Sequence, residues 1–489
     1  MNPVKVLFVS PEVVPFAKTG GLADVAGSLP KALKKLGCDV RLVMPLYRMV
    51  RQGNFPLKKK IEGIRVPVGG RAIEVDIYES TLAEGIPVYF IERDEFFDRS
   101  NLYGTSRGDY FDNDQRFVLF CQAVLALAPF IPFQPEIFHG HDWQTGLIPA
   151  YLHFRRPWDP FWAHTASIFT IHNIAYQGMF DPDIIPLAGL PWEAYSPSGL
   201  EYWGSVNLLK SGIVYSQIIN TVSRKYSQEI QTEEYGYGLE GILSYRRNDL
   251  FGIVNGVDYE DWNPETDPLI AAPYGANDLS GKTVCKIDLL KQFNLSEERQ
   301  AYPIVGVISR LADQKGFDLL AAVMDKLIEQ EMTLVILGTG EEKYHQLFSE
   351  LAAKYPQKIG LRLAYDNTLA HKIEAGSDMF LMPSRYEPCG LNQIYSLKYG
   401  TIPIVRATGG LDDTIQPFQA QDQSGTGFRF QEYRAQAFWQ SIEEALQTYK
   451  NPNLWRVLMR QAMTRDFSWE NSAREYLRLY QMARDRLSA

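Results

Sequence analysis

The sequence is poor in cysteine and in positive charge, and each shortage argues against a class of protein. Its 489 residues include four scattered cysteines without a CxxC pair, Cys38, Cys121, Cys285 and Cys389. We therefore expect no disulfide framework and a reducing compartment. The net charge is −9, whereas proteins that bind a phosphate backbone carry a basic surface. A nucleic-acid partner is not expected.

The sequence also lacks a long apolar run. The most membrane-like stretch, 118–133, contains Gln122 and is broken by Pro129 and Pro132. It is too short and interrupted to span a bilayer, so it predicts a buried helix that ends near Pro129. The apolar run 4–9 follows Met1 without a charged segment or a cleavage site. We expect a cytoplasmic protein with no membrane partner, and a plastid-like compartment only if a transit peptide has been removed.

What the chain does contain is enough apolar material for two sizeable cores. The composition is 45% hydrophobic and 22% charged, close to the average of globular proteins, and the length predicts two or three domains. The 27 Tyr and 9 Trp offer flat faces on which a neutral sugar polymer could stack. Filling of cores and seams explains most of these aromatic residues equally well.

Short β-branched runs alternate with helical patterns, which predicts βα units and parallel sheets. The candidate strands of the first half lie at 5–10, 40–45, 136–140, 167–172, 217–222 and 250–255. Those of the second half lie at 303–309, 333–338, 359–365, 379–384 and 402–407. Turn formers and prolines between the two series place an interdomain linker region at 256–282. The predicted domains are thus 1–255 and 283–466, followed by an amphipathic helix within 467–489 that could pack back on the first domain.

The loop after the first strand has the composition of an anion site. Gly20 and Gly21 permit close backbone approach, a helix starts near Leu22 with free N–H groups, and Lys18 adds positive charge. The pattern is neither GxGxxG nor GxxxxGK[ST], so it predicts neither a dinucleotide site nor a P-loop. A plain structural turn with a solvated lysine remains the alternative.

Polar residues cluster at three later strand ends of the first half, where a parallel sheet binds its ligands. They are His139, His141 and Asp142, then His172 and Asn173, then Asn255. A lone histidine at such a position is more often structural, but three such ends in one sheet favour a site. The histidines lack HxxxH and HExxH spacing and no DxD loop is apparent, so no metal is expected.

The second half carries the stronger signals. Arg310 follows a strand and Lys315 precedes a helix, so the two cations are placed to neutralise a diphosphate. Glu387 lies just before another helix, at its positive end, where a carboxylate could bind sugar hydroxyls. Close by, Cys389 is expected to serve as a small residue that fits the available space and not as a nucleophile. A second phosphate is expected at the backbone amides of Gly390, Leu391 and Asn392. A third glycine-rich turn, ATGGLDDTI at 407–415, fits a sugar contact and a plain turn equally.

Several long motifs, in a fixed order, closely resemble the bacterial glycogen synthase and plant starch synthase family. They are KTGGLADV, HDWQTGL, TASIFTIHNIAYQG, VNGVDYEDWNP, SRLADQKG, SRYEPCGLNQIYSLKYG and ATGGLDDTI. The resemblance runs from about residue 4 to the FSWE segment near residue 467. One position departs from the family's THN triplet, because Ile171 stands where Thr is common, and we expect little effect from a side chain that points into the sheet.

The resemblance implies a GT-B fold, two doubly wound Rossmann-like α/β domains facing a central cleft. It implies transfer of glucose from ADP-glucose to the non-reducing end of an α-1,4-glucan such as glycogen, starch or a maltooligosaccharide, with retention and without a metal or other cofactor. The catalytic residues it implies are Asp142, His172, Arg310, Lys315 and Glu387.

The resemblance also implies a substrate-binding set. Lys18 would join Arg310 and Lys315 on the diphosphate, and Tyr365 would stack on the base. Glu12 and Asn173 would lie near the transferred glucose or the glucan. The rest of the set lines the donor site: Gly21, Asp24, Asn255, Cys389, Gly390, Leu391 and Asn392.

Three other functions remain open at this stage. One is a related glucosyltransferase that uses UDP-glucose or a small acceptor. Glucan phosphorylase is less attractive, because the sequence offers no convincing lysine context for pyridoxal phosphate. The last is a non-catalytic glucan-binding scaffold, against which the intact set Lys18, Arg310, Lys315 and Glu387 argues. Nothing in the sequence indicates an oligomeric state.

No second carboxylate stands out as a nucleophile. For a transfer with retention, this favours attack of the acceptor on the same face of the sugar over a covalent intermediate.

Overall fold

The computed structural model describes residues 3–105 and 107–488, and its internal contacts divide them into two compact units. Unit 1 consists of the described residues up to Gly256 together with those from Trp469 onward, and unit 2 consists of Val257–Ser468. The chain therefore passes from one unit to the other twice. Almost all of the segment 256–282, predicted as a linker, belongs to unit 2, and the helix predicted in the tail belongs to unit 1.

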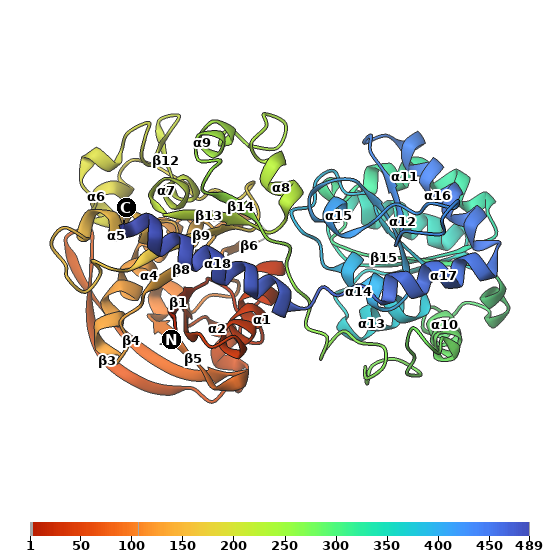
Figure 1. The fold of residues 1–489 in the computed structure, drawn as a ribbon, viewed down its shortest axis with the longest axis horizontal. Helices are drawn as coiled ribbons and strands as arrows, with labels where there is room; N and C mark the ends of the chain where they lie inside the picture. The colour runs from red at the N-terminus through yellow and green to blue at the C-terminus, as the bar shows by residue number, and fades with distance from the viewer. Residues whose placement is uncertain (1–2, 106, 489) are drawn as a thin grey trace. The chain divides into compact units, whose positions relative to one another are not determined.

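Unit 1 is built on a nine-stranded sheet in the order β14-β13-β9-β8-β1-β2-β5-β4-β3 (Figure 1). The strands from β14 to β5 are parallel, and β4 and β3 extend the sheet as an antiparallel edge. The strands are β1 (Lys5–Val9), β2 (Asp39–Pro45), β3 (Lys58–Val68), β4 (Arg71–Leu82), β5 (Ile86–Glu92), β8 (Ile137–His141), β9 (Ala166–Ile171), β13 (Ile218–Thr221) and β14 (Leu250–Gly252).

The central strands are buried because both faces of the sheet are covered. Every residue of β8 and β9 is buried, and β1 lies between β8 and β2, with Val6 opposite both Ile137 and Val40. In β3, by contrast, exposed and buried positions alternate toward the carboxyl end, since one face meets solvent.

Helices of unit 1 connect and cover these strands (Figure 1). They are α1 (Gly21–Lys35), α2 (Arg48–Gln52), α3 (Asp94–Phe97), α4 (Asn113–Leu127), α5 (Leu147–Arg155), α6 (Ile184–Ala188), α7 (Leu208–Tyr215), α8 (Arg224–Glu229), α9 (Glu240–Tyr245) and α18 (Trp469–Ser488). The predicted helix that ends near Pro129 is α4. Short strands form two small sheets, β10 (Met179–Phe180) with β12 (Ser205–Asn207) and β11 (Glu201–Tyr202), and β6 (Gly104–Thr105) with β7 (Gly108–Asp109).

The last helix, α18, is part of unit 1 although it follows unit 2 in the chain. It packs on α1 and β9, and Figure 1 shows it in blue beside α1. Ala473, Tyr476, Tyr480 and Ala483 are buried, so the amphipathic spacing of the sequence defines the face that joins the core.

Unit 2 contains a six-stranded sheet in the order β17-β16-β15-β18-β19-β20, all parallel. Its strands are β15 (Ile304–Ile308), β16 (Thr333–Leu337), β17 (Ile359–Arg362), β18 (Met379–Met382), β19 (Ile402–Arg406) and β20 (Phe428–Phe430). Its helices are α10 (Ser280–Gln292), α11 (Phe317–Glu329), α12 (Glu342–Lys354), α13 (Asn367–Gly376), α14 (Asn392–Lys398), α15 (Gly409–Thr414), α16 (Ala435–Tyr449) and α17 (Pro452–Met463).

In both sheets the strand order reverses at one point. In unit 2, β15 lies between β16 and β18, and in unit 1, β1 lies between β2 and β8. Loops leave such a point in opposite directions, which opens a crevice at the carboxyl ends of the two central strands. The segments that follow β1, β8, β15 and β18 are therefore the places to look for a site. The predicted doubly wound α/β fold is confirmed in each unit.

The segment before α10 is held firmly within unit 2. The Trp262 ring stacks on His371 on one side and on Tyr395 on the other, with ring centroids 3.7 and 3.9 Å apart. The Asp267 carboxylate accepts a hydrogen bond from the Tyr399 hydroxyl at 2.5 Å and lies 2.7 Å from Nδ1 of His371.

Across residues 3–105 and 107–488, no helix combines the length and apolar character needed to cross a membrane. The four cysteines all lie in the described chain as buried thiols, and no disulfide links any two of them.

Candidate active site

Glu12 follows β1 and is occupied by the chain's own donors. Its carboxylate accepts hydrogen bonds from the Thr19 backbone N–H at 2.5 Å, the Gly20 N–H at 3.2 Å and the Tyr103 hydroxyl at 2.7 Å, and also from the Thr19 hydroxyl. Only 3% of Glu12 is exposed. Through these hydrogen bonds, Glu12 stabilises the loop that leads into α1.

Lys18 and Asp24, both predicted near the donor, pair with each other. The Lys18 ammonium lies 2.7 Å from Oδ1 of Asp24, and both side chains are partly exposed. Burial raises the pKa of Asp24, although the ammonium of Lys18 acts in the other direction. The structure thus brings these two residues together at the start of α1.

Gly20 and Gly21 leave room beside this ion pair. A Cβ atom added to either residue would meet no atom of the other described residues within 4 Å, and neither glycine has a positive φ. Packing and backbone conformation therefore do not require glycine here. Close approach of a ligand to the backbone is the remaining physical reason for a glycine pair.

Asp142 follows β8 in a backbone conformation that is unusual for a residue other than glycine, with φ 54° and ψ −179°. Its Oδ1 accepts a hydrogen bond of 2.7 Å from the His172 backbone N–H. Burial raises the pKa of Asp142 to about 7. The hydrogen bond from His172 thus holds the carboxyl group of Asp142 at the end of β9.

Three histidines form a buried chain at the ends of β8 and β9. The His139 and His141 rings lie 4.2 Å apart between centroids, and Nδ1 of His141 lies 3.0 Å from Nε2 of His172. Burial lowers the pKa of His139 and of His172 to about 3 and that of His141 well below its usual value. All three rings are therefore neutral at pH 7.

The hydrogen bonds of His141 assign its tautomer. Its Nε2 is buried and has no partner among the described residues, and a buried N–H without an acceptor is costlier than an unused lone pair. The proton of His141 therefore lies on Nδ1, which donates to Nε2 of His172. His172 then carries its own proton on Nδ1 and offers it as a donor at the carboxyl end of β9.

Tyrosines of α18 complete this network. The Tyr480 hydroxyl lies 3.0 Å from Nδ1 of His139, whose Nε2 lies 2.7 Å from the Thr170 hydroxyl. Thr170 donates to Oδ1 of Asn220 at 2.6 Å, and Nδ2 of Asn220 donates to the Tyr476 hydroxyl at 3.0 Å. The tail helix thus supports the strands that carry Asp142 and His172.

Two asparagines lie at neighbouring strand ends. Asn173 accepts a hydrogen bond of 3.0 Å from the Ala175 N–H, which closes a local turn. Asn255 is 5% exposed, and its Oδ1 has no hydrogen-bond partner in the described chain. An orphaned buried oxygen is a feature that a ligand donor would relieve.

In unit 2 the switch point carries an ion pair. The Lys315 ammonium, at the end of the loop after β15, lies 2.6 Å from Oε2 of Glu387 in the loop after β18. The Ser384 hydroxyl donates to the same oxygen at 3.1 Å. Glu387 is 5% exposed, and within the described residues its Oε1 has no hydrogen-bond partner, so that oxygen is left for a ligand.

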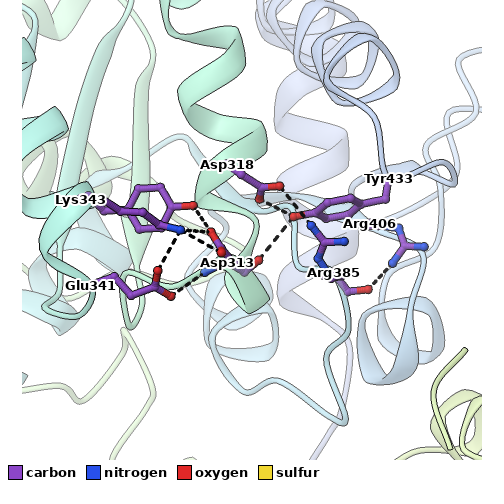
Figure 2. A network of polar contacts seen from close by, with 8 residues as sticks. Asp313, Asp318, Glu341, Lys343, Arg385, Arg406 and Tyr433 are labelled. Carbon is purple, nitrogen blue, oxygen red and sulfur yellow. Dashed lines mark hydrogen bonds and ion pairs between the residues drawn. The ribbon is translucent and has the colours of Figure 1, made fainter. Parts of the chain in front are cut away.

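A polar network holds the loop that carries Lys315 (Figure 2). The Asp313 carboxylate binds the Lys343 ammonium at 2.7 and 2.9 Å and accepts a hydrogen bond from Tyr344. Tyr433 donates to Asp318, and the Arg385 guanidinium lies 4.2 Å from the centre of the Tyr433 ring.

The same network reaches the loop of Glu387. Arg385 lies two residues before Glu387, and its guanidinium donates to Asp318 at 3.3 Å, while its backbone N–H donates to the carbonyl oxygen of Gln314 at 2.8 Å. Figure 2 shows the contact between Arg385 and Asp318. These contacts fix the separation of Lys315 and Glu387.

Backbone donors collect beside Glu387. In the described part of the chain, the N–H groups of Gly390, Leu391 and Asn392 donate no hydrogen bond. The Asn392 side chain donates to the Ile308 carbonyl at 2.7 Å, and Cys389 is 5% exposed. The segment therefore presents a row of backbone donors, and Cys389 is a small buried residue behind it.

The third glycine-rich turn supports this segment by packing. A Cβ atom at Gly409 would lie 1.9 Å from the Glu387 carbonyl oxygen, and one at Gly410 would lie 2.0 Å from that of Cys389. Gly409 also has a positive φ of 45°. Both glycines therefore let α15 pack against the backbone around Glu387.

Within the described residues, the predicted Arg310 and Tyr365 form no hydrogen bond with Lys315 or Glu387. The Arg310 guanidinium donates to the Gln314 side chain at 2.9 Å. Tyr365 is 80% exposed and follows β17. Both stand at the carboxyl edge of the sheet, the edge that binds ligands in this fold.

The structure thus gathers most of the predicted residues at one switch point in each unit. The partners that sequence reasoning missed are Thr19, Tyr103, Ser384, Tyr476 and Tyr480. The tyrosine spacing in the tail was the one available signal, because Tyr476 and Tyr480 stand one helical turn apart. No group of three or more His, Cys, Asp or Glu residues able to hold a metal ion lies within residues 3–105 and 107–488.

Comparison with known proteins identifies both units. Residues 5–245 match the family described as "Starch synthase catalytic domain", and residues 290–457 match "Glycosyl transferases group 1". The chain is 49% identical over 479 residues to a glycogen synthase of Koribacter versatilis, which covers 98% of each chain. It is 45% identical over 482 residues to glycogen synthase 2 of Geobacter sulfurreducens, which covers 99% of each.

Solved structures agree with these matches. The catalytic domain of starch synthase IV from Arabidopsis thaliana, bound to ADP and acarbose, is 34% identical with a TM-score of 0.89, over 99% of this chain and 100% of that one. A sucrose-phosphate synthase from Thermosynechococcus elongatus, 17% identical with a TM-score of 0.59, shares the fold. With relatives matched over nearly its whole length, the chain belongs to the glycogen and starch synthase family of glycosyltransferases and has the two α/β units of the GT-B fold.

Proposed function

We propose that the protein is a glycogen synthase that transfers glucose from ADP-glucose to the non-reducing end of an α-1,4-glucan, with retention of configuration. The observation that carries the proposal is the Lys315–Glu387 ion pair at the switch point of the six-stranded sheet, in a chain 49% identical to a glycogen synthase. A starch synthase catalytic domain of the same fold, solved with ADP and acarbose, supports the donor and the acceptor classes.

The diphosphate of the donor is assigned to cations and backbone amides. Arg310 and Lys315 supply positive charge, Arg by a fork and Lys as a point charge. The unoccupied N–H groups of Gly390, Leu391 and Asn392 donate to phosphate oxygens. Lys18, beside the open backbone of Gly20 and Gly21, supplies a further cation. The exposed ring of Tyr365 offers its face to the adenine base.

The glucose and the acceptor glucan are assigned to the polar groups that remain. The free Oε1 of Glu387 accepts hydrogen bonds from sugar hydroxyls, and the Nδ1–H of His172 donates to one. The carboxyl group of Asp142 and the amides of Asn173 and Asn255 complete the set. Glu12 and Asp24 contribute through the loop that they hold rather than by contact.

The proposed chemistry is a displacement on one face of the sugar. The bond from the anomeric carbon to the diphosphate oxygen breaks, and the acceptor hydroxyl forms the new bond on the same face. The proton of that hydroxyl passes to the departing phosphate. Lys315, Arg310 and the backbone amides stabilise the charge that develops on the leaving group, a contribution that grows as the bond lengthens.

Initial rates with ADP-glucose and UDP-glucose, each on glycogen and on short maltooligosaccharides, test the proposal. We expect turnover with ADP-glucose and longer glucan chains whose new linkages are α by NMR. Preference for UDP-glucose or for a small acceptor would assign another glucosyltransferase. Glucan binding by calorimetry without turnover of either donor would assign a scaffold.

The proposed setting is the cytoplasm. Four buried thiols without a disulfide fit a reducing compartment. Burial raises the pKa of Cys38 to about 11 and that of Cys121 further, so these thiols are weak nucleophiles and are poorly placed to oxidise.

A further inference from the structure

One buried side chain binds the backbone that carries the row of donors beside Glu387. Gln393, in the first turn of α14, is fully buried. Its Nε2 donates hydrogen bonds to the carbonyl oxygen of Cys389 at 3.0 Å and to that of Gly390 at 3.1 Å. Because a carbonyl oxygen only accepts, these two contacts assign the nitrogen of the Gln393 amide, and not its oxygen, to this position.

We propose that Gln393 is a positioning residue for the donor diphosphate. A peptide group is planar and trans, so its C=O and its N–H point in opposite directions. The C=O of Cys389 shares a peptide group with the N–H of Gly390, and the C=O of Gly390 shares one with the N–H of Leu391. A side chain that binds both carbonyl oxygens therefore turns both N–H groups away from itself.

These two N–H groups donate no hydrogen bond within the described residues. The inference rests on the proposed function, in which they donate to phosphate oxygens of the nucleotide sugar. Donors whose direction is fixed before the ligand arrives bind it at a lower entropic cost. Gln393 thus acts on the diphosphate through the backbone and not by contact.

Gly390 gives Gln393 the space that this arrangement needs. A Cβ atom on Gly390 would lie 2.5 Å from Oε1 of Gln393. Gly390 also has a positive φ of 70°, a backbone conformation that favours glycine. Both observations tie the glycine to the side chain behind it, in addition to any contact with a ligand.

The neighbouring helix α15 binds the same segment in the same way. The Gly410 N–H donates to the carbonyl oxygens of Glu387 at 3.1 Å and of Pro388 at 3.2 Å. Nε2 of Gln393 also lies 3.3 Å from the Thr414 hydroxyl, which donates to the Gly410 carbonyl at 2.6 Å. Four consecutive carbonyl oxygens, beginning with that of Glu387, therefore accept hydrogen bonds from groups of α14 or α15.

Gln393 fills this place at a cost. Its Oε1 has no hydrogen-bond partner in the described chain, and a buried polar atom left in this state costs about 1–3 kcal/mol. Proteins retain such local costs chiefly at functional sites. The cost fits a residue whose contribution is the orientation of the backbone.

Calorimetry on the full chain tests the proposal with the variant Gln393→Met, which keeps the length of the side chain and removes its donors. ADP and adenosine are titrated separately, because adenosine carries the base and the ribose without the phosphates. The matched control is Gln122→Met. Gln122 is a buried glutamine of unit 1 whose Nε2 donates to the Ala188 carbonyl at 2.9 Å.

We expect the Kd of ADP to rise about tenfold in Gln393→Met, the equivalent of about 1.4 kcal/mol, and to stay unchanged in the control. The Kd of adenosine should be the same in all three proteins. An unchanged Kd of ADP in Gln393→Met would overturn this inference alone. An equal rise for adenosine would also overturn it, because the substitution would then have loosened the whole nucleotide site.

A second variant keeps the test decisive if Gln393→Met does not fold. Thr414→Val removes only the hydroxyl that links Gln393 to Gly410, and we expect it to raise the Kd of ADP about threefold without changing that of adenosine. An unchanged Kd of ADP in this variant would then overturn the inference. Absence of ADP binding to the wild type would overturn the proposed function and this inference together.

Discussion

Nδ1 of His141 lies 3.0 Å from Nε2 of His172, and this contact selects which proton His172 presents to its surroundings. His141 donates because its own Nε2 is buried and has no partner within residues 3–105 and 107–488. His172 is thereby held as the Nδ1–H tautomer, a donor suited to a sugar hydroxyl. The chemistry of one histidine is thus set by a neighbour that need not touch the substrate.

Replacing His141 with Leu should lower kcat by about tenfold, the effect of about 1.4 kcal/mol at the transition state. The variant His141→Asn is the matched control, since its side-chain amide places an N–H near the position of Nδ1. Nitrogen NMR of the His172 ring reports the tautomer directly. A proton on Nε2 of His172 in the wild type would contradict the assignment.

Replacing Lys315 with Met or Glu387 with Gln should lower kcat by about 10² to 10³, the usual cost of losing a group that stabilises transition-state charge. Lys372→Met is the control, because Lys372 pairs with Asp288 at 2.8 Å in the same unit and is buried to a similar degree. Steady-state rates and thermal unfolding separate catalysis from stability. Equal loss of activity in the control would remove the special role of the pair.

The stability of unit 1 should depend on Asp142 in a defined pH window. Burial raises the pKa of its carboxyl to about 7 from an ordinary value of 3.8, so the folded state binds more protons than the unfolded state between these values. The stabilising effect of the proton is complete below about pH 4 and is lost as the pH rises through 7.

The variant Asp142→Asn should therefore gain stability relative to the wild type between pH 4 and pH 7, by up to about 4 kcal/mol. Urea unfolding followed by a probe in unit 1 measures the difference at each pH. The buried histidines contribute an opposite trend, because their lowered pKa values favour the neutral form, but this trend is common to both proteins. A difference that does not change with pH would show that the carboxyl titrates normally.

Removal of one hydroxyl from the tail helix should weaken unit 1. Tyr480→Phe leaves Nδ1 of His139 without its hydrogen bond in a buried site, which costs about 1–3 kcal/mol. Tyr245→Phe is the control, since Tyr245 is 82% exposed. Equal unfolding free energies for the two variants would show that the hydrogen bond between Tyr480 and His139 does not stabilise unit 1.

Glu12→Gln should loosen the loop before α1 without a large loss of stability. Gln keeps one acceptor oxygen for the Thr19 and Gly20 N–H groups, but its amide nitrogen cannot accept the hydrogen bonds that Oε1 of Glu12 receives from the Thr19 and Tyr103 hydroxyls. We expect faster hydrogen exchange at residues 18–21 and a higher KM for the donor. Glu62→Gln, at a side chain that is 78% exposed, should change neither quantity.

The central sheets could be predicted because their strands are buried on both faces. Continuous apolar runs such as KVLFV mark β1, and each strand predicted from such a run is present. The strands of the two main sheets that were missed are β3, β4, β5 and the short β20. In β3 and β4, charged residues alternate with apolar ones along an antiparallel edge, and a search for continuous apolar runs passes over that pattern.

The candidate site was predictable as a set of strand ends but not as a set of contacts. Glycine-rich and charged loops after β1, β15 and β18 were visible in the sequence. The partner of Glu12 is Tyr103, 91 residues away, and that of His139 is Tyr480, 341 residues away. Such pairs are determined by how distant segments pack, which periodicity and spacing along the chain do not encode.

The double passage of the chain between the units has a consequence for biosynthesis. Tyr476 and Tyr480 are translated only after all of unit 2, yet they complete the buried polar network of unit 1. During translation, the sheet of unit 1 is made first, but its polar network lacks the hydrogen bonds of Tyr476 and Tyr480 until the last helix has been made. Unit 2 is made later, yet all of its own residues are already present when it folds. Unit 1 is therefore the first unit to be synthesised and the last to be completed.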